Sequence, residues 1–168
     1  DVDAYQNEPI RVDLRLKYPQ FKFIILSVAP RSASQDMLLA LKVFSVVFGK
    51  YPHTGMVIVC GGISRYILRL HTIFLGISDN VVIEKSSDNL VSYFKTSHVF
   101  LMPAIYDDND FLIEKASACG CPVVCTPIGI AQLTISNGDS GFLCEIGDVQ
   151  CFISSITKGW KRKNHTDP

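Results

Sequence analysis

The sequence predicts an α/β fold, a doubly wound parallel sheet of the Rossmann-like type with helices on both faces. Two observations carry this prediction. Short, unbroken apolar runs of strand length recur along the chain, as is typical of parallel strands buried on both faces. Each run is followed by a segment with apolar residues at near-helical spacing, which implies right-handed crossovers between parallel strands. The length of 168 residues corresponds to one such domain.

The first β-loop-α unit is the clearest. The apolar run over 23–28 predicts a buried strand, and the apolar residues from Ser34 onward predict a helix that stops at Gly49. The alternation continues with a strand over 56–60, the pair Gly61-Gly62, a helix over 66–74, a strand over 81–83, a helix over 90–95, a strand over 98–102, a helix over 111–119 and a strand over 122–125. Ligands of such sheets bind beyond the carboxyl ends of the strands, so the loops that follow the strands hold the candidate site.

Composition excludes several classes of function. With 16 basic and 16 acidic residues the formal net charge is zero, so no long-range field gathers nucleic acid, which is excluded as a general partner. The longest apolar run, over 21–30, is interrupted by Lys22 and Ser27 and is far shorter than the ~20 residues of a membrane helix. The first residues lack the basic and apolar regions of a secretory signal. A cytoplasmic location is therefore expected.

The six cysteines are expected to be reduced thiols. An even number in a short secreted chain would suggest bridges, but all except Cys151 have apolar or small neighbours, where a thiol packs as a compact hydrophobe. Cys119, Cys121 and Cys125 are close in sequence, yet they lack paired Cys-x-x-Cys spacing and a nearby histidine. We therefore expect no metal site.

Three stretches in the last part of the chain carry a more specific signal. The stretch over 98–107 is a strand that ends in proline with acidic residues after it, 111–129 contains Glu-x-Ala-x-Ala-Cys-Gly-x-Pro-Val-Val, and 137–144 contains Asn-Gly-x-x-Gly-Phe-Leu. Together they resemble the carboxyl-terminal domain of retaining glycosyltransferases of family four, which have the two-domain GT-B fold. Weaker agreement extends upstream over nearly the whole chain.

The resemblance implies the donor half of an enzyme that transfers a hexose. The donor would be a UDP-, GDP- or ADP-sugar as co-substrate, with no other cofactor. The acceptor, a sugar, lipid or protein, would be held by a separate amino-terminal domain, so the isolated chain should not turn over. The expected division is a leading segment or linker over 1–20, a nucleotide-sugar-binding domain over 21–157 and a polar tail over 158–168.

Glu114 is the strongest site candidate. In the family, the matching glutamate accepts hydrogen bonds from ribose hydroxyls, a role that suits an ionised carboxylate. The alternative is a glutamate favoured only by the helix dipole. A second family glutamate lies near the transferred sugar with seven residues between the two; the nearest equivalent here is Asp107, with six between. Alternatively, Asp110 caps the following helix while Asp107 and Asp108 solvate the turn.

The expected phosphate contacts depart from the family pattern. Pro30 and Gln35 stand where the family has an arginine and a lysine, so Arg31 and Arg65 are the remaining candidates for a cation. The family has a glycine-rich turn after the strand that corresponds to 98–102. This chain has acidic residues there instead, and their negative charge opposes the binding of a phosphate.

Further donor contacts are implied by position. Gly61 and Gly62 follow a strand and precede a helix, as a phosphate or base-approach turn would. Ile83 and Glu84 match the segment that holds the nucleobase, largely through backbone groups and apolar contact. The turn over 126–129 resembles one near the donor sugar. Phe111, the first residue of the second matching stretch, is also expected to be a cofactor-binding residue.

Three alternative interpretations and one structural role also follow from the sequence. The missing cations and the acidic turn also fit a catalytically degenerate, glycosyltransferase-like scaffold or interaction domain. Another sugar-nucleotide enzyme, such as an epimerase, would need catalytic acids and a histidine arrangement that the sequence lacks. His98 stands in place of a common family aspartate at a strand start, and a structural role is expected for it. Lys158 to Lys163 with Trp160 resemble an interfacial anchor for anionic lipid, so a membrane contact is a weaker expectation.

Overall fold

The computed structural model describes residues 2–29, 35–85, 88–105 and 110–166, the last with backbone alone at 160 and 162–166. The elements in chain order are α1 (Val2–Asn7), α2 (Leu14–Lys17), β1 (Phe23–Ala29), α3 (Gln35–Lys50), β2 (Thr54–Cys60), α4 (Ser64–Phe74), the 3-10 turn η1 (Ser78–Asn80), β3 (Val81–Glu84), α5 (Leu90–Thr96), β4 (Val99–Met102), α6 (Asp110–Ala118), β5 (Val123–Cys125), α7 (Ala131–Thr134), β6 (Gly141–Leu143) and α8 (Val149–Thr166).

The strands form one parallel sheet in the order β3-β2-β1-β4-β5-β6. This confirms the doubly wound, Rossmann-like prediction. β1 lies at the centre, with Ile25 opposite both Met56 of β2 and Val99 of β4. All seven residues of β1 and of β2 are buried, as their predominantly apolar runs predict. The order reverses between β1 and β4, so the carboxyl ends of these two strands flank the expected ligand crevice.

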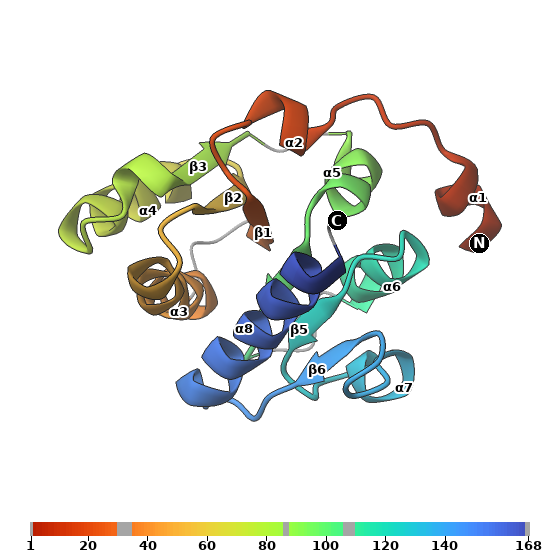
Figure 1. Cartoon of the computed structure of the whole chain (residues 1–168). Helices are drawn as coiled ribbons and strands as arrows, with labels where there is room; N and C mark the ends of the chain where they lie inside the picture. Colours follow the sequence, from red (N-terminus) through yellow and green to blue (C-terminus); the bar gives the residue numbers. More distant parts are fainter. Residues whose placement is uncertain (1, 30–34, 86–87, 106–109, 167–168) are drawn as a thin grey trace.

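Helices cover both faces of the sheet (Figure 1), and an apolar layer of buried side chains lies between the sheet and the helices on each face. On one face, Ile25 and Met56 pack with side chains of α3, α4 and α8, among them Phe44, Leu68 and Phe152. On the other face, strand residues pack with Leu14 of α2 and with side chains of α5, α6 and α7. The core is therefore divided by the sheet, and every long helix contributes to one of its two layers.

The leading segment is fastened to the second face by hydrogen bonds to α5. The Leu14 backbone N–H donates to Thr96 Oγ1 at 3.1 Å, and the Arg11 N–H donates to Ser92 Oγ at 2.9 Å. Leu14 itself is fully buried. The first residues of the chain therefore pack against the domain.

Two elements near the end of the chain differ from the simple alternation that the sequence predicts. The Asn-Gly-x-x-Gly-Phe-Leu stretch forms β6 over Gly141–Leu143, which closes the sheet beside β5. A Cβ atom on Gly141 would lie 2.0 Å from the Val123 carbonyl oxygen, so glycine is required for this strand to approach its neighbour. Beyond it, residues 158–166 continue helix α8.

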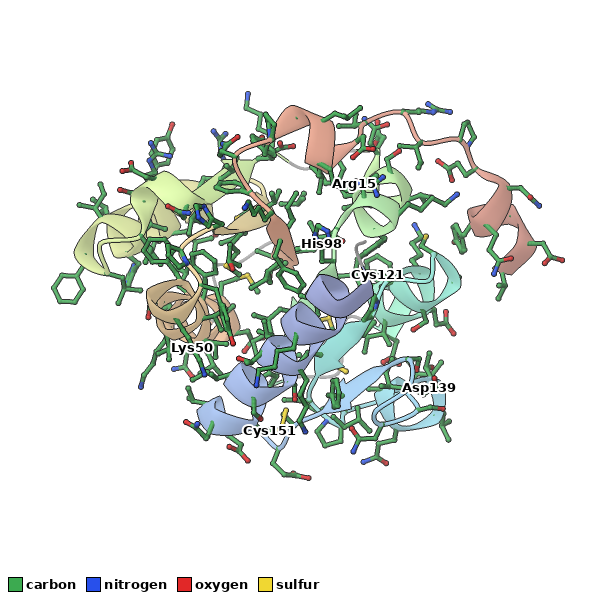
Figure 2. The ribbon with its side chains drawn as sticks, viewed as in Figure 1. Arg15, Lys50, His98, Cys121, Asp139 and Cys151 are labelled. Carbon is green, nitrogen blue, oxygen red and sulfur yellow. A yellow bond between two sulfur atoms is a disulfide. The ribbon has the colours of Figure 1, made fainter. Side chains whose placement is uncertain are left out.

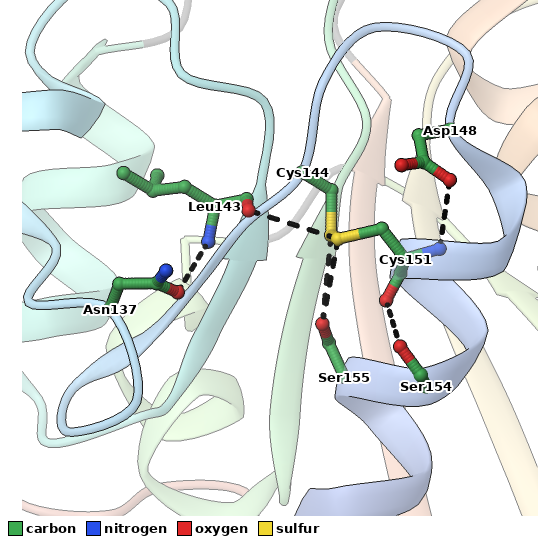
Figure 3. The surroundings of a disulfide bond; sticks show 7 residues. All are labelled: Asn137, Leu143, Cys144, Asp148, Cys151, Ser154 and Ser155. Carbon is green, nitrogen blue, oxygen red and sulfur yellow. Dashed lines mark hydrogen bonds between the residues drawn. A yellow bond between two sulfur atoms is a disulfide. The ribbon is translucent and has the colours of Figure 1, made fainter.

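A disulfide joins Cys144, just after β6, to Cys151 in the first turn of α8 (Figure 3). The expectation of reduced thiols was wrong for this pair. The two Cα atoms lie 5.6 Å apart, within the range that a disulfide spans, because Asp148 turns the chain back by accepting a hydrogen bond from the Cys151 N–H at 3.0 Å. The residues next to a cysteine in the sequence indicate whether its thiol is buried. They do not indicate this pairing, which depends on the turn between β6 and α8.

The other four cysteines are free thiols. Cys60, Cys121 and Cys125 are buried, and burial raises the pKa of Cys121 and of Cys125 to about 12. These thiols are inert core groups, as expected.

Candidate functional site

The described loops at the carboxyl ends of β2 to β5 bring most of the predicted site residues to one edge of the sheet. Gly61 and Gly62 follow β2, and Glu84 ends β3. Phe111 and Glu114 lie on α6, the helix that follows β4. Arg31 and Asp107 lie outside the described residues.

The Gly61-Gly62 turn leaves open space beside the backbone. Gly62 has a φ of 66°, a left-handed conformation that favours glycine. A Cβ atom at either position would meet nothing within 4 Å among the described residues. A ligand can therefore approach this backbone closely, as a phosphate or base turn requires.

A hollow between α4, the helix that follows this turn, and β3 is lined by Arg65, Tyr66, Arg69 and Ile83 and has a volume of about 220 Å³. It brings Arg65 and Ile83, predicted separately as a cation and a base contact, into one place. The Arg65 Nε is buried and has no hydrogen-bond partner within the described parts of the chain. Two guanidinium groups on one hollow, one of them with a donor to spare, suit an anionic ligand. The sequence-based prediction did not include Arg69, although its spacing of four positions from Arg65 places both residues on one side of α4.

The Glu84 carboxylate is engaged within the protein. Lys17 Nζ lies 2.6 Å from Oε1, and the hydroxyls of Tyr18 and Tyr93 donate to Oε1 and Oε2. Burial acts to raise the pKa of Glu84, but the hydrogen bonds from Lys17, Tyr18 and Tyr93 outweigh it and hold that pKa below its usual range. A ligand at this position would meet the backbone of Glu84, while the side chain holds the leading segment against β3.

Glu114 lies in the second turn of α6, exposed to solvent, and Phe111 is exposed one turn earlier. Across the described residues, the Glu114 carboxylate forms neither an ion pair nor a hydrogen bond. Its oxygens are therefore available to accept from hydroxyl groups. Beside it, Lys115 Nζ lies over the rings of Tyr5 and Phe111, 5.5 and 5.9 Å from their centroids.

The turn after β5 is tied to the segment after β4. Asp110 Oδ1 accepts a hydrogen bond from the Ile130 N–H at 3.0 Å, and Thr126 Oγ1 donates to the Ala104 carbonyl at 2.6 Å. Asp110 opens α6, yet its carboxylate reaches the residue before α7. These two bonds hold the predicted donor-sugar turn over 126–129 beside the start of α6.

A second cavity, of about 280 Å³, lies at the opposite edge of the sheet. It is mainly apolar, bounded by Phe23, Phe142 and Gly159, and its polar lining includes His98 and Asp139. Figure 2 labels both of these polar residues. The His98 ring is already hydrogen-bonded within the protein, because its Nδ1 accepts the Ile24 N–H at 2.8 Å. The cavity lies at the amino ends of the strands, away from the edge where sheets of this type bind ligands.

The described residues contain no group of three or more His, Cys, Asp or Glu side chains that could hold a metal ion. Within the same residues, none of the helices combines the length and the apolar character needed to cross a membrane.

Comparisons with known proteins agree with this architecture. Residues 22–161 match the family described as glycosyl transferases group 1. An uncharacterized glycosyltransferase of Haemophilus influenzae is 27% identical over 135 residues, which are 79% of this chain and 38% of that protein. The chain therefore spans well under half the length of this curated relative.

Two solved structures share the fold. HepE from Anabaena, in complex with UDP and glucose, superposes with a TM-score of 0.81 at 17% identity over 99% of this chain and 47% of that one. The carboxyl-terminal domain of the protein LpcC from Francisella tularensis superposes with a TM-score of 0.78 at 14% identity, over 98% of this chain and 89% of that one. At these identities the likeness concerns the fold, and it confirms the expected carboxyl-terminal half of a GT-B architecture.

Proposed function

Because the chain belongs to the group 1 glycosyl transferases, we propose that it binds the nucleotide diphosphate sugar from which a retaining enzyme transfers a hexose. The observation that carries this proposal is the exposed Glu114 carboxylate on α6, the helix that follows β4. β4 is one of the two strands between which the sheet order reverses, and ligands of doubly wound sheets bind at that point.

The described residues suggest a division of roles. Glu114 accepts hydrogen bonds from the ribose hydroxyls, for which its four lone-pair sites are suited. The open Gly61-Gly62 turn and the hollow with Arg65 and Ile83 provide a backbone approach, a cation and an apolar contact for the nucleotide.

The transfer itself requires more than this chain. Asp107 is the proposed residue beside the transferred sugar, and the acceptor is held by a separate amino-terminal domain. The chain covers 38% of the Haemophilus relative, which is in keeping with a donor half that binds nucleotide but does not turn over alone.

Titration calorimetry with UDP, GDP and ADP tests the proposal. HepE was solved with UDP and glucose, so UDP is the first ligand to try. One of the three should bind with measurable heat, and Glu114→Ala should weaken it at least about tenfold, since a hydrogen bond to a charged group contributes roughly 1.5–3 kcal/mol.

Glu145→Ala is the matched control, because Glu145 is also an exposed glutamate, located after β6. It should leave nucleotide binding unchanged. Absence of heat with all three nucleotides, or equal losses in the two variants, would overturn the donor-site proposal.

A degenerate scaffold is the second candidate. Gln35, the first residue of α3, stands where the family carries a lysine, and the Glu84 side chain is committed to Lys17 and two tyrosines. A folded chain that binds none of the nucleotides, yet forms a stable complex with the rest of its polypeptide or a neighbouring subunit on a sizing column, would favour this role.

A further inference from the structure

Most of the large apolar side chains of helix α4 lie on its solvent-exposed face and not on the face that packs against the core. The side chains that it buries are Ser64, Leu68 and Thr72. Its large apolar side chains point to solvent instead, together with the residue before the helix; they are Ile63, Tyr66, Ile67, Leu70, Ile73 and Phe74. An ordinary surface helix shows the reverse arrangement.

These exposed residues form one continuous strip. Ile63, Ile67, Leu70 and Phe74 are spaced by three or four positions, so they lie on one side of the helix, and Tyr66 and Ile73 extend it. Leu70 is 67% exposed and Phe74 is 88% exposed. A patch of contiguous apolar side chains of this kind marks an interaction surface.

The charges beside the strip are all of one sign. Arg65 and Arg69 project from α4 along one border of the strip, and no acidic residue occurs between Gly61 and Ser78. A second copy docked through the same strip would bring two pairs of arginines together without any acidic partner from that stretch. An anionic surface, in contrast, complements both the apolar strip and its basic border.

We propose that α4 docks in the headgroup region of an anionic membrane. In this arrangement the strip from Ile63 to Phe74 enters the boundary with the acyl chains, and Arg65 and Arg69 contact lipid phosphates. Low mean hydropathy with a strong apolar face and flanking basic residues is typical of interfacial helices. The contact lies on the surface of the bilayer and requires no spanning segment. Arg65 and Arg69 also line the hollow proposed for the nucleotide, so the apolar strip distinguishes the membrane contact from the nucleotide site.

Flotation with lipid vesicles tests the proposal. The chain should float with vesicles of equal parts phosphatidylcholine and phosphatidylglycerol, and much less with phosphatidylcholine alone. The double variant Leu70→Ser with Phe74→Ser should bind the mixed vesicles at least about tenfold more weakly, because two exposed apolar anchors are removed. Arg69→Gln should weaken binding and reduce its dependence on salt.

Leu133→Ser is the matched control, since Leu133 on α7 is 89% exposed but lies outside the strip. It should bind the mixed vesicles as the unaltered chain does, and circular dichroism should show that all variants keep their helices. The proposal is overturned if the chain stays unbound with both vesicles, or if Leu133→Ser loses as much binding as the double variant. It is equally overturned if light scattering shows a dimer that the double variant disperses while neither protein binds vesicles.

Discussion

The Lys17 ammonium nitrogen lies 2.6 Å from Glu84 Oε1, joining the leading segment to the end of β3 across 67 residues of sequence. Tyr18 and Tyr93 donate to the same carboxylate, so groups from α2, from its carboxyl-terminal cap and from α5 meet at Glu84. The Glu84 side chain is mostly shielded from solvent, which strengthens these charge-assisted bonds relative to a surface pair.

Glu84→Gln should lower the free energy of unfolding by about 1–3 kcal/mol, because the neutral amide replaces a charged acceptor of three hydrogen bonds. Urea denaturation at neutral pH measures the loss. Glu145→Gln, at an exposed position, should change the midpoint little. Equal effects of the two substitutions would contradict the structural role assigned to Glu84.

The Glu84 cluster also predicts a pH dependence. The folded-state pKa of Glu84 lies below the ordinary value of 4.5, so the ionised carboxylate stabilises the fold above that value. This contribution is lost as the pH falls through the folded-state pKa. The difference in unfolding free energy between the unaltered chain and Glu84→Gln should therefore be constant near neutral pH and shrink below about pH 4.5. A difference that grows in acid would show the opposite linkage.

The disulfide between Cys144 and Cys151 should stabilise the fold by reducing the conformational entropy of the unfolded chain. The two cysteines are seven positions apart, and closing a loop of that size corresponds to about 2.5 kcal/mol in the chain-entropy description. A reductant should lower the urea midpoint of the unaltered chain and leave that of Cys151→Ser unchanged.

Thiol titration of the unfolded chain provides an independent check of the pairing. Four thiols should react without reductant, since four cysteines are free, and all six after reduction. Six reactive thiols before reduction would show that the pair is open.

Gly141→Ala should destabilise the chain by more than about 2 kcal/mol, because the added methyl group overlaps the Val123 backbone and pushes β6 away from β5. Gly49→Ala is the control: it lies in α3 with nothing within 4 Å of the added atom among the described residues. Gly49 is the second-last residue of α3, where alanine is favoured over glycine by up to about 0.5–1 kcal/mol. Thermal melts of both variants should therefore shift in opposite directions.

Local pattern predicted most of the sheet. The first five strands are apolar runs, and each falls within one or two residues of its predicted bounds; the 56–60 run, for example, becomes β2 over Thr54–Cys60. β6 has three residues, too few for a periodic pattern, and the reason for its glycine is a contact with β5. Short helices such as α2 likewise depend on packing, here of Leu14 against α5.

The site was predictable only as a set of loops. Sequence position placed Glu84 and Ile83 at the end of β3, but it did not indicate that Lys17, Tyr18 and Tyr93 occupy the Glu84 carboxylate, because these partners come from distant segments. The apolar period of α4 likewise predicted a helix without showing which face would meet the core. Three buried residues, Ser64, Leu68 and Thr72, decide that face, and two of them are polar.

His98 has the structural role expected for it, and its contacts predict how substitutions will rank. Its Nδ1 accepts the Ile24 N–H at 2.8 Å, and its ring stacks on Phe23 with centroids 5.0 Å apart. The backbone N–H of His98 donates to the Ile24 carbonyl at 2.9 Å. His98→Ala removes the acceptor and the stacked ring, and should cost about 2–3 kcal/mol of unfolding free energy.

His98→Asn separates these two contributions. The Asn Oδ1 is as many bonds from the backbone as the histidine Nδ1, so it can accept the same N–H while the stacked ring is lost. We expect it to recover about half of the loss seen with alanine, since the acceptor contributes about 1–3 kcal/mol and the stacked pair about 0.5–1.5 kcal/mol. Urea denaturation of the three proteins measures the ranking. If asparagine is as damaging as alanine, the Nδ1 acceptor contributes nothing and the loss is that of the stacked ring.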